Sequence, residues 1–308
     1  MDEAIDEPWP RRILERLDGA ARAFGVELAA AWVELAARLR LLDPTPPGYF
    51  THPLALPTLE LPRWAGALAA RRGRPVAAPR LEEAAEAAAA GYLHVRLHDD
   101  FIDEGRGDPA VVMLLAEALL VHHQALMAAL LPSGSAFWGQ QRATWLAYHE
   151  AMLRERRGHR DGVDDAAAFA AVLGRSRPLA LPPAAVLVHA GLDELVPDVA
   201  AIIEALARGH QLYLDLLHGE RDLALGNRTW VLSRLASGGD RPALRRRLIA
   251  GGLDEIVDEA AADLERAAAG ARGLGWDELG GWIAARRGQM EATRTAVYAE
   301  LFGGLLGG

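Results

Sequence analysis

Four acidic residues gather within six positions of the chain, at Asp99, Asp100, Asp103 and Glu104. On a helix, Asp99 and Asp103 lie one turn apart on the same face, and so do Asp100 and Glu104. Like charges at this spacing repel, so a sequence selected for stability alone would avoid them. Carboxylate oxygens are ligands that Mg²⁺ prefers, usually shared with phosphate oxygens of a substrate. The stretch therefore indicates a metal-diphosphate site, with an exposed acidic helix end as the alternative.

A second group of polar residues follows more than a hundred positions later. Its members are separated by four, three and four residues and so share one helical face: Gln211, Asp215, His218 and Asp222. Leucines stand between them, as in a bundle helix with one polar stripe. Buried polar groups cost free energy unless they are paired or coordinated. Two such stripes on two helices could face each other across a cavity and share metal ions, as helical bundles do.

The elements that position these residues are predicted to be helices. Ala and Leu dominate the sequence, and aromatic residues make up only 6% of it, which favours an all-α fold. We expect one domain spanning residues 1–308, with about ten helices around a central cavity. The first helix is expected over 10–42, and the acidic stretch ends an apolar helix that begins near Arg80. Asp108-Pro109 starts the next helix, as cap and first helical residue, and Pro197 opens the helix of the second stripe.

Composition narrows the function classes. The chain has 308 residues, of which 51% are hydrophobic, and no cysteine, which excludes disulfides and thiolate sites. With 33 basic and 42 acidic side chains the net charge is −9, which argues against a nucleic-acid partner. The N-terminus is acidic rather than positively charged as a signal peptide would be, and no run of about 18 uncharged apolar residues indicates a membrane span. A cytoplasmic protein is expected.

The two stripes resemble the motifs of the class I isoprenoid synthases, which comprise prenyl diphosphate synthases, squalene and phytoene synthases and terpene cyclases. Residues His98 to Asp103 match their DDxxD motif in full. In the second motif of the prenyl synthases, Q-x-x-D-D-x-x-D, Gln211 and Asp215 fit, whereas Leu214 and His218 replace acids. Against the squalene and phytoene type, the matching residues are Gln211, Leu212, Gly219 and Asp222. The segment Arg175-Ser176-Arg177-Pro178-Leu179 looks like a substituted K-T-A-x-L diphosphate segment.

The resemblance implies an isoprenoid-synthase-like fold, Mg²⁺ as cofactor and a prenyl diphosphate as substrate, and it leaves a homodimer open. It implies four metal ligands: Asp99, Asp103, Asp215 and Asp222. The residues implied in catalysis are Asp99, Asp100, Asp103 and Arg175. Those implied in substrate binding are Arg175, Arg177, Gln211 and His218, to which Arg294 and Tyr298, one helical turn apart, are added as a cap on the diphosphate.

One departure from the family sets the expected reaction. Chain-elongating enzymes carry a G-K-R-x-R-type segment for the second diphosphate, and the nearest basic cluster here is Arg71-Arg72-Gly73-Arg74-Pro75, in a different context. Cyclisation or water capture of one substrate, a lyase-type terpene synthase reaction, is therefore expected before chain elongation by a prenyltransferase. The terpene-cyclase N-S-E triad is not visible either.

Two further readings stay open. Because two acids of the second motif are replaced, the chain could bind an isoprenoid or a partner helix without catalysis. The His98-Asp99 doublet is also typical of HD-type metal phosphohydrolases, for which His94, His122 and His123 could supply imidazole ligands.

Overall fold

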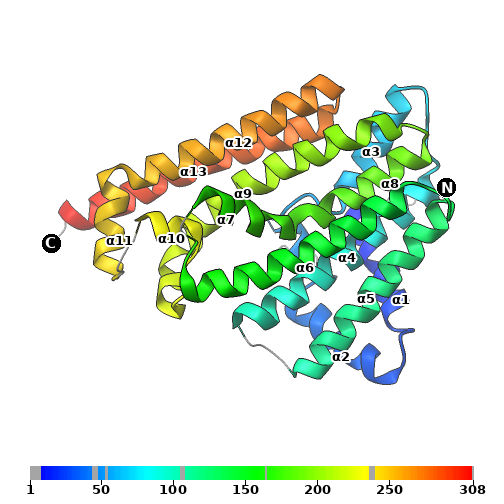
Figure 1. Cartoon of the computed structure of the whole chain (residues 1–308), viewed down its shortest axis with the longest axis horizontal. Coiled ribbons are helices and arrows are strands. Elements are labelled where there is room, and N and C mark those ends of the chain that lie inside the picture. The colour runs from blue at the N-terminus through cyan, green and yellow to red at the C-terminus, as the bar shows by residue number, and fades with distance from the viewer. Residues whose placement is uncertain are drawn as a thin grey trace, which may run out of the picture. The chain divides into compact units, whose positions relative to one another are not determined.

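The computed structural model describes residues 8–43, 48–52, 55–104, 108–163, 165–235 and 240–306 (Figure 1). These residues form thirteen α-helices and contain no strand, which confirms the all-α prediction and exceeds the predicted ten helices. The chain groups into two compact units. Unit 1 comprises Met1–Arg142 and Pro178–Val196, and unit 2 comprises Ala143–Arg177 and Pro197–Gly308. A single functional domain stays a prediction.

Unit 1 is built around one long helix. Its helices are α1 (Trp9–Ala21), α2 (Val26–Leu39), α3 (Glu60–Arg71), α4 (Ala78–Glu104), α5 (Pro109–Leu130) and α8 (Leu181–His189), with the short η1 (Tyr49–Thr51) and η3 (Asp193–Leu195). Helix α4 contacts α1, α3, α5 and α8. Its alanines at positions 84, 85 and 87–90 are nearly fully buried, and small side chains let neighbouring helices approach closely. At Gly91 a Cβ atom would lie 2.9 Å from Nδ1 of His123 on α5. The acidic stretch therefore ends the central helix of this unit.

Two predictions about helix boundaries in unit 1 have different outcomes. Asp108 caps α5 as expected, because its carboxylate accepts a hydrogen bond from the backbone N–H of Ala110 at 2.8 Å, with Pro109 at the first helical position. The single helix predicted over 10–42 is wrong, since the chain forms α1 and α2 instead. Gly25, with φ of +108°, precedes α2 in a conformation that interrupts a helix and that few other residues adopt.

Unit 2 contains the second polar stripe on α9. Its elements are most of α6 (Phe137–Asp161), α7 (Ala166–Val172), most of η2 (Leu173–Ala180), α9 (Val196–Leu225), α10 (Trp230–Leu235), α11 (Arg241–Arg247), the π-helical η4 (Leu248–Gly252), α12 (Leu253–Leu274) and α13 (Asp277–Leu306). Helices α12 and α13 lie side by side (Figure 1). Helix α9 approaches α12 closely at Gly209, where a Cβ atom would lie 2.7 Å from the Ala260 carbonyl oxygen. The Tyr213 hydroxyl lies 2.6 Å from the Thr293 hydroxyl on α13.

Among the described helices, α5 meets the length and composition of a membrane span, with a mean hydropathy of 1.6 and a third of that window buried. Length and composition are weak evidence by themselves, because a core helix of a globular protein meets them too.

Candidate functional site

The acidic stretch on α4 places its first two acids in different surroundings. Asp100 is buried, with 3% of its surface exposed. Its carboxylate accepts a hydrogen bond from Nη2 of Arg38 on α2 at 3.0 Å and pairs with Nη2 of Arg96, one turn earlier, at 2.5 Å. Asp99 is half-buried, with Oδ2 at 3.6 Å from Nη1 of Arg96. Asp103 lies on the same helix, but its side chain lies outside the described residues. Asp100 is thus directed into the unit, and Asp99 is the more accessible acid.

Arg96 forms ion pairs with both Asp99 and Asp100. Burial lowers the pKa of its guanidinium, but Tyr49, Asp100 and Asp99 outweigh burial and raise it above the ordinary value. The guanidinium also lies over the Tyr49 ring, 5.6 Å from its centroid. Sequence reasoning did not single out Arg96, although its spacing of three and four residues from the two acids was a readable signal.

The second stripe centres on a buried network in unit 2. Arg175, on η2, donates from Nη1 to Oε1 of Glu155 on α6 and from Nη2 to Oε1 of Gln211 on α9, the latter at 2.6 Å. Gln211 in turn donates from Nε2 to Oδ1 of Asp215 at 2.5 Å. Glu155 and Asp215 are each 6% exposed. The structure therefore brings together three residues singled out from the sequence, Arg175, Gln211 and Asp215, and adds Glu155.

Asp215 titrates far from its ordinary range. Burial raises its pKa to about 7, and the nearby charges of Glu155 and Asp222 act in the same direction. The charge of Arg175 and the hydrogen bond from Gln211 oppose this rise but do not cancel it. Near neutral pH the carboxyl group is therefore divided between its neutral and ionised forms.

Among the other predicted residues of unit 2, Asp222 lies near enough to Asp215 for its charge to raise the pKa of that carboxyl group. Asp222 is half-buried on α9, while His218 on α9 and Arg177 on η2 are exposed. Arg294 on α13 makes ion pairs with Glu291 and with two carboxylates of α12, and its pKa is raised above the ordinary value, chiefly by the hydrogen bond to Glu291. The Tyr298 hydroxyl donates to Oδ2 of Asp254 at 2.7 Å. Arg294 and Tyr298 therefore both bind α13 to α12.

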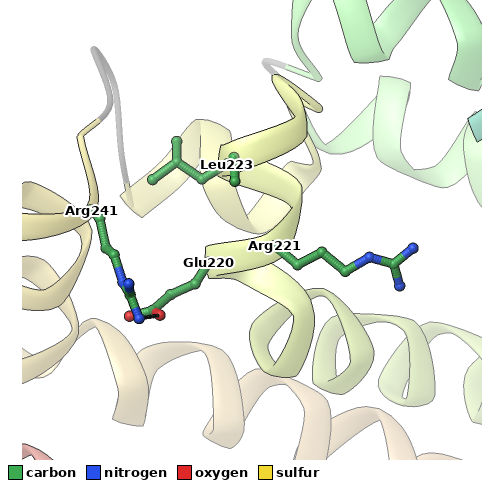
Figure 2. A pocket seen from close by; sticks show the side chains of 5 residues that line it. Glu220, Arg221, Leu223 and Arg241 are labelled. Carbon is green, nitrogen blue, oxygen red and sulfur yellow. Dashed lines mark ion pairs between the residues drawn. The ribbon is translucent and has the colours of Figure 1, made fainter. Parts of the chain in front are cut away.

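A pocket of about 470 Å³ opens at the end of α9 (Figure 2). It is lined by Glu220, Arg221, Leu223, Ala224 and Arg241. The Glu220 carboxylate meets the Arg241 guanidinium, whereas the Arg221 side chain points away from this pair (Figure 2). With two apolar side chains and an internal ion pair, the pocket is not the apolar cavity expected for a prenyl chain, and Asp215 does not line it.

The histidines proposed for a phosphohydrolase site have packing partners in unit 1. Nδ1 of His94 donates to the Ala116 carbonyl at 2.9 Å, and Nδ1 of His123 donates to the Ala87 carbonyl at 2.8 Å. Burial lowers the pKa of His123 to about 4. Nε2 of His122 lies 2.8 Å from Oε1 of the buried Glu86. These bonds join α4 to α5, so the geometry favours a structural role.

Magnesium fits the two motifs unequally. On α4, Asp99 and Asp103 stand one turn apart and offer hard oxygen ligands of the kind Mg²⁺ requires. On α9, Asp215 instead accepts a hydrogen bond from an amide and lies beside an arginine. Within the part of the chain that the structure describes, no three His, Asp or Glu side chains converge as a metal site would need. The donor chemistry thus supports a metal at the first motif and not at Asp215.

Comparisons with known proteins identify the fold. Neither a scan against protein-family models nor a search of curated proteins finds a match. A geranylgeranyl pyrophosphate synthetase from the archaeon Geoglobus acetivorans superposes with a TM-score of 0.67 at 12% identity, over 92% of this chain and 98% of that one. A polyprenyl synthase from Roseobacter denitrificans gives 0.61 at 16% identity, over 90% and 99%. A decaprenyl diphosphate synthase from Rhodobacter capsulatus gives 0.61 at 15%, over 89% and 99%. The chain therefore has the fold of the class I isoprenoid synthases.

Proposed function

We propose that this chain is a Mg²⁺-dependent prenyltransferase that ionises an allylic prenyl diphosphate and joins it to a second, smaller isoprenoid diphosphate. The observation that carries the proposal is the complete Asp99–Asp103 motif at the end of the central helix of unit 1, in a fold shared with prenyl and polyprenyl synthases. The same comparisons favour transfer over the cyclisation or water capture expected from the sequence, because the solved structures reported above carry the names of chain-elongating enzymes.

In this proposal the residues of the chain divide the work of ionisation. Asp99 and Asp103 would hold Mg²⁺, which supplies positive charge to the diphosphate oxygens. Arg175 presents a planar guanidinium, whose fork of N–H donors matches phosphate oxygens. Fixed positive charge stabilises the departing diphosphate, and apolar helix faces keep water from the allylic cation. Asp222 stays a predicted metal ligand, and Arg177, His218, Arg294 and Tyr298 stay predicted substrate contacts.

The proposal extends to the whole chain. The similarity to the archaeal synthetase covers 92% of this sequence and 98% of the other, which supports one functional domain made from both units.

The test is an assay with geranyl, farnesyl and geranylgeranyl diphosphates plus Mg²⁺, with and without isopentenyl diphosphate. A longer prenyl diphosphate that requires both substrates supports the transferase. A hydrocarbon or alcohol formed from one substrate alone would support the cyclase instead. The absence of any Mg²⁺-dependent product, with the protein shown to be folded by circular dichroism, would favour a binding protein of the same fold.

A further inference from the structure

Two helices of unit 2 direct polar groups at one guanidinium, which comes from a third helical element. Glu155 comes from α6, Arg175 from η2 and Gln211 from α9, and the chain of hydrogen bonds continues from Gln211 to Asp215. Both carboxylates in this network are 6% exposed. A buried carboxylate is strongly destabilised unless a positive charge or several hydrogen bonds compensate it. Arg175 supplies that compensation directly to Glu155 and, through the Gln211 amide, to Asp215.

The geometry differs from that of a wall of metal ligands. Carboxylates that share a metal ion point their oxygens at a common centre, and each oxygen offers lone pairs to it. Here Oε1 of Glu155 and the side-chain carbonyl oxygen of Gln211 converge on a guanidinium, while Oδ1 of Asp215 accepts an amide N–H at 2.5 Å. The side chains are thus arranged around a cation that belongs to the protein.

We propose that Arg175 is the resident cation of the second motif, in place of a metal ion held by Asp215, and that Glu155 is the positioning residue that fixes its guanidinium for a diphosphate group. This inference rests on the proposed function, because it concerns the same substrate class. The bonds to Glu155 and Gln211 hold the guanidinium of Arg175 from both of its terminal nitrogens. These two protein groups therefore fix the orientation of a planar fork of N–H donors, the geometry that matches phosphate oxygens.

This arrangement and a second motif that binds metal through Asp215 predict different binding behaviour. Metal binding should depend on the α4 acids and not on Asp215. Diphosphate affinity without metal should depend on Arg175 and on Glu155, although Glu155 is itself negative and would repel a diphosphate if it acted alone. A purely structural role for Glu155 would predict a change in folding with no separate change in diphosphate affinity.

The experiment uses the full chain and two probes that need no turnover. Bound Mn²⁺ is counted by electron paramagnetic resonance in the presence of pyrophosphate, and metal-free pyrophosphate affinity is measured by calorimetry in EDTA. The variants are Asp99→Asn, Asp215→Asn, Glu155→Gln and Arg175→Gln, with Arg175→Lys and Glu155→Asp as conservative controls. Thermal unfolding of each variant reports whether it is folded.

We expect Asp215→Asn to bind as many Mn²⁺ ions as the wild type and Asp99→Asn to bind fewer. Glu155→Gln should weaken metal-free pyrophosphate binding about tenfold, the order of one lost charged hydrogen bond, and Arg175→Gln should weaken it further. Arg175→Lys and Glu155→Asp should each recover part of the loss. The inference is overturned if Asp215→Asn loses a Mn²⁺ ion, if Glu155→Gln binds pyrophosphate like the wild type, or if the wild type does not bind it. Binding as expected without any prenyl product would overturn only the proposed function.

Discussion

The acidic end of α4 and the polar stripe of α9 use their carboxylates in a parallel way. In each motif one acid is buried and paired inside its own unit: Asp100 with Arg38 and Arg96, and Asp215 with Gln211 beside Arg175. In each, another acid is only half-buried, namely Asp99 on α4 and Asp222 on α9. Aspartates of the same motif therefore lie in different surroundings, and in each motif the buried aspartate lies beside an arginine.

The two regions also differ in how charge is balanced. On α4 two arginines face Asp100, and one of them has a raised pKa because its acidic and phenolic neighbours outweigh burial. Around the polar stripe of α9, Arg175 of η2 lies near two buried acids, Glu155 and Asp215, and burial raises the pKa of Asp215 to about 7. The first region thus offers two arginines to one buried acid, whereas the second offers one arginine to two.

The largest effect should follow from neutralising the accessible acid of α4. Replacing Asp99 by Asn removes a proposed metal ligand, so Mg²⁺-dependent product formation should fall by about a thousandfold or more. Stability should change little, since Asp99 is half-buried and its ion pair with Arg96 is 3.6 Å long. Product formation from farnesyl and isopentenyl diphosphates, with urea unfolding as the control, checks both parts. An active variant would contradict the role given to Asp99.

Neutralising the buried acid of the same motif should reverse this pattern. Asp100→Asn leaves Arg38 and Arg96 facing a neutral group that is 3% exposed, and we expect unfolding to become easier by about 2 kcal/mol. Both arginines are partly exposed and can turn to water, which keeps the loss below that of a fully buried pair. Urea unfolding measures the change. A variant as stable as the wild type would show that these ion pairs do not hold α2 to α4.

These residues show how much of the fold and of the candidate site can be predicted from the sequence. The all-α fold and the Asp108 cap were predicted, and Arg175, Gln211 and Asp215 were each singled out, because helical periodicity, capping chemistry and family motifs are local signals. Arg96 could have been found from its spacing to Asp99 and Asp100. Arg38 and Glu155 could not, because their partners lie 62 and 20 residues away along the chain and no periodicity records such a pairing.

A smaller, pH-dependent effect should distinguish Asp215. Its pKa is raised from 3.8 to about 7 in the folded protein, so the native state binds more protons than the unfolded state within that window. Stability from this group is complete below the lower pKa and is lost as pH rises through about 7. The window corresponds to a few kcal/mol at most. Asp215→Asn should therefore gain stability relative to the wild type between pH 5 and pH 8, values that bracket the folded pKa.

Two buried histidines provide an internal control for that measurement. Burial lowers the pKa of His123 to about 4 and that of His210 to about 3. Because these pKa values lie below the ordinary 6.5, the wild type and the Asp215→Asn variant should both lose stability as the pH falls below 6.5. This loss is common to the wild type and to Asp215→Asn, so it cancels in their difference. Urea unfolding at several pH values gives that difference, and a flat difference across the window would contradict the buried state of Asp215.

The smallest effect is expected far along the chain, at Arg294. Its partners Glu291, Asp258 and Asp254 have side chains that are 51%, 67% and 47% exposed, and exposed ion pairs contribute little. Arg294→Gln should therefore lower the free energy of unfolding by less than about 1 kcal/mol.

The same variant also tests the predicted cap on the diphosphate. If Arg294 and Tyr298 only join α13 to α12, as the Tyr298–Asp254 hydrogen bond indicates, KM for the allylic diphosphate should stay within about twofold of the wild type, because no charged hydrogen bond to the substrate is lost. A cap on the diphosphate would instead raise KM about tenfold or more, the loss expected for one charge-assisted bond. Steady-state kinetics of Arg294→Gln beside Arg294→Lys separates the outcomes, since lysine preserves the charge but not the fork. A rise in KM for the Gln variant that Lys reverses would place the C-terminal helix at the substrate.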